Sequence, residues 1–197
     1  MKIFISGVSG VGKTTMAKQI SKDYKIPFIE GSSKVLWDKY NIKSHIELIK
    51  KTYLEPQFGL DFQNELLDYR KNLIEKNDSF VSDRSPLDNL TYFLLQVSDK
   101  LDSNETLKYI EKCNQAYPNK YIQVYLGFNY NMGKQFFEND GFRINNIYYQ
   151  FMVDAVFRQI ITGNWLGINM DDFIRISTWD FRVKHELIKD KIQEVYG

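Results

Sequence analysis

The chain has 197 residues with 43% hydrophobic and 26% charged side chains, and 26 Lys and Arg balance 25 Asp and Glu to give a formal net charge of +1. That balance excludes a strong overall attraction to nucleic acid, although it is compatible with a local basic groove. A single cysteine, Cys113, excludes an internal disulfide, and no apolar run reaches membrane-spanning length, so we expect one cytoplasmic domain over residues 1–197 with no membrane partner.

A phosphate-binding motif stands between the first two predicted elements. Residues 1–6 form a β-branched and aromatic run that predicts a buried strand, and residues 15–20 carry apolar side chains at helical spacing. Between them, the sequence GVSGVGKT over residues 7–14 fits the Walker A pattern G-x-x-x-x-G-K-[ST]. A strand before the motif and a helix after it are the context in which this pattern binds nucleotides.

The chemistry of a triphosphate explains these residue types. The three glycines allow positive φ and a close approach of the backbone, and successive N–H groups then form an anion site at a helix N-terminus. Lys13 is expected to reach the β- and γ-phosphates of ATP, and the Thr14 hydroxyl to ligate Mg²⁺. The expected nucleotide-binding residues are Gly7, Ser9, Gly10, Val11, Gly12, Lys13, Thr14 and Thr15.

A short second strand is predicted over residues 26–30, and it ends in Glu30. Because ligands of open α/β sheets bind at the carboxyl ends of the strands, Glu30 stands where an acceptor would lie, or else it is a carboxylate of a surface loop. Residues 34–57 read as mixed helix and loop. Within them Trp37 is a core residue or a pocket wall, and His45 is a surface or packing residue.

The next two elements bring further charged residues. Residues 60–76 predict an amphipathic helix, on which Arg70 either reaches the site or is a solvated charge. A third strand at residues 80–81 is followed by Asp83 and Arg84, and Pro86 then opens a helix. Asp83 can hold Mg²⁺ directly or through water, and Arg84 can bind a phosphate or orient a catalytic carboxylate.

The second half of the chain continues the alternation of strands and helices. The segment 127–144 is polar and rich in asparagine and glycine, and we expect a lid there that closes over ATP. Arg143 is the candidate cation of this lid, and Lys134 is a weaker one. The remaining predicted elements are helices at 87–97, 103–116, 146–162 and 181–196 and strands at 121–126 and 173–177.

This order of elements, together with the Walker A loop and Asp83-Arg84-Ser85, resembles the P-loop nucleoside and nucleotide kinases. The triplet is similar to the Glu-Arg-Ser of deoxynucleoside kinases and to the Asp-Arg-aromatic of thymidylate kinases. Glu30 and Trp37 resemble a pair in deoxynucleoside kinases in which the glutamate acts as base on the acceptor hydroxyl. The resemblance implies an α/β fold, the three-layer α/β/α P-loop NTPase, with a five-stranded parallel sheet of order 2-3-1-4-5.

Three functions follow as hypotheses. The first is an ATP- and Mg²⁺-dependent transfer of the γ-phosphoryl group to a nucleoside or nucleotide, with Glu30 or Asp83 as base and Thr14 and Asp83 on the metal. The second is a phage-type kinase acting on the hydroxymethyl group of 5-hydroxymethyluracil in DNA. The third is a switch ATPase; the guanine-reading motif N-K-x-D is absent from the sequence. The expected catalytic residues are Lys13, Glu30, Asp83, Arg84 and Arg143, and the assembly, monomer or homodimer, stays open.

Overall fold

A parallel sheet forms the centre of the computed structural model, which describes residues 1–129 and 146–197. The described part contains five strands in the order β2-β3-β1-β4-β5, and all neighbouring pairs are parallel, which confirms the predicted topology. The strands are β1 (Lys2–Gly7), β2 (Phe28–Ile29), β3 (Phe80–Ser82), β4 (Ile122–Leu126) and β5 (Phe173–Ile176).

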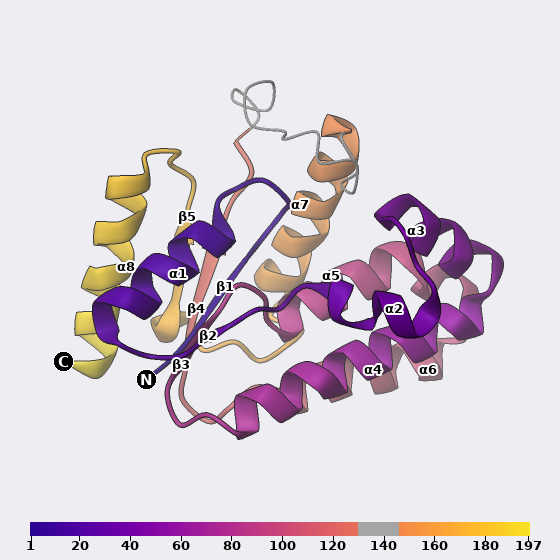
Figure 1. Cartoon of the computed structure of the whole chain (residues 1–197), viewed down its shortest axis with the longest axis horizontal. Coiled ribbons are helices and arrows are strands. Elements are labelled where there is room, and N and C mark those ends of the chain that lie inside the picture. Colours follow the sequence, from indigo (N-terminus) through magenta and orange to yellow (C-terminus); the bar gives the residue numbers. More distant parts are fainter. Residues whose placement is uncertain (130–145) are drawn as a thin grey trace.

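Helices cover both faces of the sheet, as expected for three layers (Figure 1). On one face lie α1 (Lys13–Tyr24) and α8 (Phe181–Tyr196); on the other lies α5 (Pro86–Gln96), flanked by α4 (Pro56–Glu75) and α7 (Ile147–Thr162). The shorter or more peripheral elements are η1 (Ser33–Leu36), α2 (Trp37–Tyr40), α3 (His45–Leu54), η2 (Ser98–Lys100), α6 (Ser103–Gln115) and η4 (Met170–Asp172). In the two described ranges no helix combines the length and apolarity needed to cross a membrane.

The central strand is buried on both faces because helices pack on each side of it. Ile3, Phe4 and Ile5 of β1 have no exposed surface, which is typical of a parallel sheet covered by crossover helices. The two chain ends lie beside each other, since the Lys2 amide donates to the Tyr196 hydroxyl at 3.1 Å. Helix α8 therefore closes the fold against its first strand.

Several observed boundaries differ from the predicted ones, and one segment stays untested. Strand β2 keeps only two of the five predicted residues, and α4 begins four residues early at Pro56, where a proline suits the first helical turn. Of the expected lid at 127–144, only residues 127–129 are described, so Lys134 and Arg143 lie outside the described residues.

The topology gathers the predicted site residues at one edge of the sheet. Strands β1, β2 and β3 are neighbours and parallel, so their carboxyl ends meet at that edge. The Walker A loop follows β1, Glu30 follows β2, and Asp83 follows β3. Because the sheet reverses its order next to β1, this edge is the position at which open α/β folds bind ligands.

We expect Phe157→Ala to destabilise the fold strongly. Phe157 lies on α7 with no exposed surface, and its ring centroid is 5.4 Å from that of Tyr125 on β4. Removing the ring leaves a cavity between helix and sheet and should lower the free energy of unfolding by about 3–5 kcal/mol. Phe151→Ala on the same helix is the control, because Phe151 is 49% exposed; denaturant unfolding should show a much smaller loss, and equal losses would contradict this account of the core.

Candidate active site

The Walker A loop lines a pocket at the carboxyl edge of the sheet. The residues of the loop that face this pocket include Gly10, Gly12, Lys13 and Thr14. The two glycines have φ of 84° and 89°, a backbone conformation that is strained for any residue with a side chain. Gly7 and Val11 do not line it. A Cβ on Gly7 would come within 2.4 Å of the Leu126 carbonyl oxygen, so that glycine serves the close packing of the loop on β4.

Side chains from inside and outside the loop hold its backbone. The Lys13 ammonium donates to the Val8 carbonyl at 2.6 Å, and the Ser9 amide donates to the Gln150 carboxamide oxygen on α7 at 3.2 Å. From α8, the Lys184 ammonium donates to the Val11 carbonyl at 2.9 Å. The loop conformation is thus fixed by bonds from both sides of the sheet.

The two residues expected to hold a metal are in direct contact. The Thr14 hydroxyl donates to Asp83 Oδ2 at 2.5 Å, and Asp83 Oδ1 accepts from the Gly31 amide at 2.7 Å. A hydroxyl beside a carboxylate offers the oxygen ligands that Mg²⁺ prefers. No group of three or more His, Cys, Asp and Glu side chains suited to a metal occurs among the described residues. Mg²⁺ is commonly held by one or two protein oxygens together with substrate phosphates and water.

Glu30 lies on the wall of the same pocket as Lys13 and Asp83, and its side chain is exposed. Among the described residues it has no hydrogen bond or ion pair. The next residue must be glycine, because a Cβ on Gly31 would stand 2.3 Å from Arg84 Cβ. This close approach brings the ends of β2 and β3 together and sets Glu30 beside the phosphate-binding loop.

A buried carboxylate positions Arg84. Asp88 has no exposed surface, and its Oδ1 accepts from Arg84 Nη1 at 2.8 Å. Its Oδ2 accepts from the Ser6 hydroxyl at 2.6 Å and from the Ser85 amide at 3.0 Å, the latter completing a capping box at the start of α5. Gln123 Nε2 donates to the Ser6 hydroxyl at 3.0 Å, so the network continues into β4.

A second pocket adjoins the first, and Ser9, Ser33, His45 and Arg84 line both. Its walls combine apolar and aromatic side chains with amides and one further arginine. The apolar residues are Leu48, Ile49, Phe62, Leu66, Tyr92 and Tyr149, and the polar ones include Gln63, Arg70, Asn89 and Gln96. Such a pocket, apolar with a few convergent polar groups, fits a flat organic ligand.

Arg70 lines this second pocket. Of the two predictions from the sequence, a residue that reaches the site and a solvated charge, the structure agrees with the first. Only 7% of Arg70 is exposed, and it donates to the Asn89 carboxamide oxygen and to the Gly31 carbonyl. Burial lowers the pKa of Arg70 to about 10, so the guanidinium stays charged at neutral pH. Beside it, Gln63 Oε1 is buried without a hydrogen-bond partner in the described structure, which leaves an acceptor for a ligand.

His45 and Trp37 have different roles from each other. Trp37 is 6% exposed and packs with Leu36, Ile42, Leu48, Phe62 and Leu66, as its reading as a core residue predicts. His45 packs edge-on against the Trp37 ring at 4.9 Å, but it also lines both pockets. The sequence contains no partner spacing that could have indicated this position for His45.

The chain is similar in sequence to one protein family and in structure to several solved kinases. A family model described as deoxynucleoside kinase matches residues 3–144. No protein with a curated description matches this sequence significantly.

Among solved structures, deoxyadenosine kinase from M. mycoides is similar at a TM-score of 0.68 with 17% identity, covering 99% of this chain and 100% of that one. Thymidylate kinase from Candida albicans is similar at 0.64 with 15% identity, covering 97% and 90%. The YorR protein from Bacillus subtilis is similar at 0.56 with 17% identity, covering 100% and 99%. These likenesses show the fold.

We expect Asp88→Ala to cost about 3 kcal/mol of unfolding free energy, because it leaves Arg84, Ser6 and the Ser85 amide without their shared acceptor. Asp68→Ala is the control, since Asp68 pairs with Lys112 at 2.9 Å but is 53% exposed, and its loss should stay within about 1 kcal/mol. Urea unfolding of both variants measures the difference. Equal stability of the two would contradict a structural role for the buried carboxylate.

Proposed function

The chain belongs to the deoxynucleoside kinase family and is a P-loop kinase, and we propose that it transfers the γ-phosphoryl group of ATP to a hydroxyl of a deoxynucleoside. The observation that carries this proposal is the pair of adjoining pockets that share Arg84. One pocket has the loop for a triphosphate, and the other has aromatic walls and amides for a base. In support, the similar deoxyadenosine kinase from M. mycoides is described with dCMP and dCDP as products and with bound dATP.

Donor binding would use the first pocket. The loop amides and Lys13 would hold the β- and γ-phosphates, and Thr14 and Asp83 would hold Mg²⁺. When bound, the ion neutralises charge that develops on the phosphate oxygens. Arg84, which Asp88 holds between the two pockets, would add a cation near the transferring group. Arg143 stays a candidate cation from the sequence alone.

The two candidate bases differ in how their oxygens are engaged. Both oxygens of Asp83 accept hydrogen bonds, from Thr14 and from the Gly31 amide, which suits a carboxylate that orients a metal. Glu30 has no such bond among the described residues and is exposed on the pocket wall. We therefore assign the general base to Glu30 and the metal to Asp83.

Arg70 of the second pocket favours a nucleoside over a nucleotide as acceptor. A phosphate acceptor needs cations that are available to it, whereas Arg70 is committed to Asn89 and the Gly31 carbonyl. The buried Gln63 Oε1 can instead accept from a ring or amino N–H of a base. A neutral nucleoside satisfies this pocket without adding an unpaired charge.

The deciding experiment is transfer from γ-labelled ATP to a panel of deoxynucleosides, deoxynucleoside monophosphates, and DNA with ordinary or hydroxymethylated pyrimidines. We expect label on deoxynucleosides. Lys13→Ala should abolish transfer, because it removes the cation that reaches the phosphates. Label on monophosphates alone would move the acceptor class to nucleotides, label on hydroxymethylated DNA alone would support a DNA kinase, and free phosphate without a labelled acceptor would contradict the kinase proposal.

Two isosteric variants separate the base from the metal ligand. Glu30→Gln should lower kcat by about 10²-fold or more at unchanged Mg²⁺ dependence, because only proton removal from the hydroxyl is lost. Asp83→Asn should instead raise the Mg²⁺ concentration needed for half-maximal turnover. Steady-state kinetics over a Mg²⁺ series measures both effects. If Asp83→Asn lowers kcat with unchanged Mg²⁺ dependence and Glu30→Gln is near wild type, the two assignments must be exchanged.

A further inference from the structure

A lysine of the last helix contacts the phosphate-binding loop at Val11, a loop residue that does not line the pocket. Lys184 of α8 is 6% exposed, and its ammonium donates to the Val11 carbonyl at 2.9 Å. The same nitrogen lies 5.0 Å from the centre of the Trp179 ring, in the connection between β5 and α8. More than 170 residues of sequence therefore separate this contact from the loop that it holds.

Burying the charged ammonium of Lys184 costs free energy of folding. No carboxylate of the described residues lies within ion-pair distance of its ammonium, and burial lowers the pKa of Lys184. A buried cation is retained at a net cost when only a carbonyl and a ring face oppose it. An apolar side chain would fill the same space beside Trp179 without that cost.

Peptide geometry connects this contact to the pocket. The bond between Val11 and Gly12 is trans, since the described residues contain no cis peptide, so the Val11 carbonyl and the Gly12 amide point in opposite directions. Val11 is 2% exposed and packs in the core, whereas Gly12 lines the pocket. A hydrogen-bond donor that holds the Val11 carbonyl on the core side therefore orients the Gly12 amide toward the pocket.

We propose that Lys184 is a positioning residue for the donor nucleotide: by binding the Val11 carbonyl it orients the Gly12 amide toward the phosphates of ATP. This inference rests on the proposed function only in taking a nucleoside triphosphate as the ligand of the loop. Gly12 has a φ of 89°, and a Cβ at this position would meet no atom within 4 Å. Contacts of Gly12 itself therefore do not fix the orientation of the peptide between Val11 and Gly12. The lysine supplies the constraint that a glycine lacks.

The test compares Lys184→Met with Lys184→Arg. Methionine fills the space and packs on Trp179 but donates no hydrogen bond, whereas arginine keeps a charged donor. We expect Lys184→Met to weaken ATP binding about tenfold, by calorimetry without acceptor, and to raise KM for ATP while KM for the nucleoside stays at its wild-type value. Lys184→Arg should restore at least part of the lost affinity.

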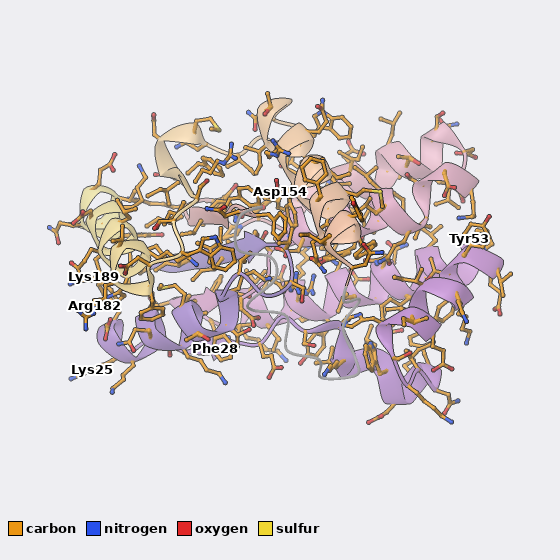
Figure 2. The ribbon with its side chains drawn as sticks, turned by 90° about the horizontal axis from the view of Figure 1, so that it is seen from above. Lys25, Phe28, Tyr53, Asp154, Arg182 and Lys189 are labelled. Atoms are coloured by element: carbon orange, nitrogen blue, oxygen red, sulfur yellow. The ribbon has the colours of Figure 1, made fainter. Side chains whose placement is uncertain are left out.

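A matched control lies on the same helix. Lys189 of α8 is 42% exposed and pairs with Glu186 at 3.3 Å, and it lies at the periphery of the molecule (Figure 2). Lys189→Met should bind ATP as the wild type does. A folded Lys184→Met with wild-type ATP affinity would overturn the proposal, and so would equal rises in both KM values with a lowered Tm, because these indicate a general structural effect.

A measurement on the wild-type protein covers the case in which Lys184→Met does not fold. With ¹⁵N-labelled lysine, the ammonium signal of Lys184 should shift when ATP is added, because the carbonyl that it binds belongs to the same peptide as the Gly12 amide. The Lys189 signal should stay in place, and an unmoved Lys184 signal would overturn the proposal. If ATP binding depends on Lys184 but no nucleoside is labelled, the proposal of a nucleoside acceptor fails and the proposal for Lys184 stands. If nucleosides are labelled but ATP affinity does not depend on Lys184, the nucleoside acceptor stands and the proposal for Lys184 fails.

Discussion

The Asp88 carboxylate, which has no exposed surface, is the constraint on which both pockets depend. A buried charge of this kind is tolerated only when donors satisfy its oxygens, and the donors here are the Ser6 hydroxyl, the Ser85 amide and Arg84. Ser6 belongs to β1 immediately before the phosphate-binding loop, and Arg84 follows β3. Satisfying one carboxylate therefore fixes the loop, the start of α5 and the arginine between the pockets relative to one another.

Much of the fold was predictable because its signals are local. The alternation of buried strands with amphipathic helices located each strand, and the Walker A motif marked the turn from β1 into α1. The strand order came from the resemblance to P-loop kinases, since no local pattern specifies which strands pair. The extent of β2 was overpredicted for two reasons. At one end, its neighbour β3 stops at Ser82, which pairs with Ile29. At the other end, Pro27 accepts from the Val81 amide but has no N–H with which to continue the ladder.

The site was predictable where residues follow strands and less so where they lie on helices. The positions of Glu30, Asp83 and Arg84 at the pocket were predictable because parallel strands bring their carboxyl ends together. Arg70 was left between two readings, yet it continues a row at four-residue spacing in α4 that is otherwise apolar: Phe62, Leu66, Arg70 and Ile74. A charge inside an apolar row indicates a buried, bonded group, and this signal was available. Gln63 and His45 carry no comparable signal, because their positions depend on how α3 and α4 pack.

The formal charge of +1 conceals an uneven distribution of charge at the site. Arg70 and Lys184 are both less than 10% exposed, and within the described parts of the chain each is bonded to backbone carbonyl or amide oxygens, with no carboxylate at ion-pair distance. A carbonyl dipole satisfies the hydrogen bond but leaves the unit charge in place, and the low dielectric around a buried cation extends its field. Two buried acids, Asp83 and Asp88, stand at the same site and offset part of that field, since both raise the pKa of Arg70 against the effect of burial. The formal charge of the whole chain therefore does not describe the local balance at the site, where buried cations and buried acids lie close together.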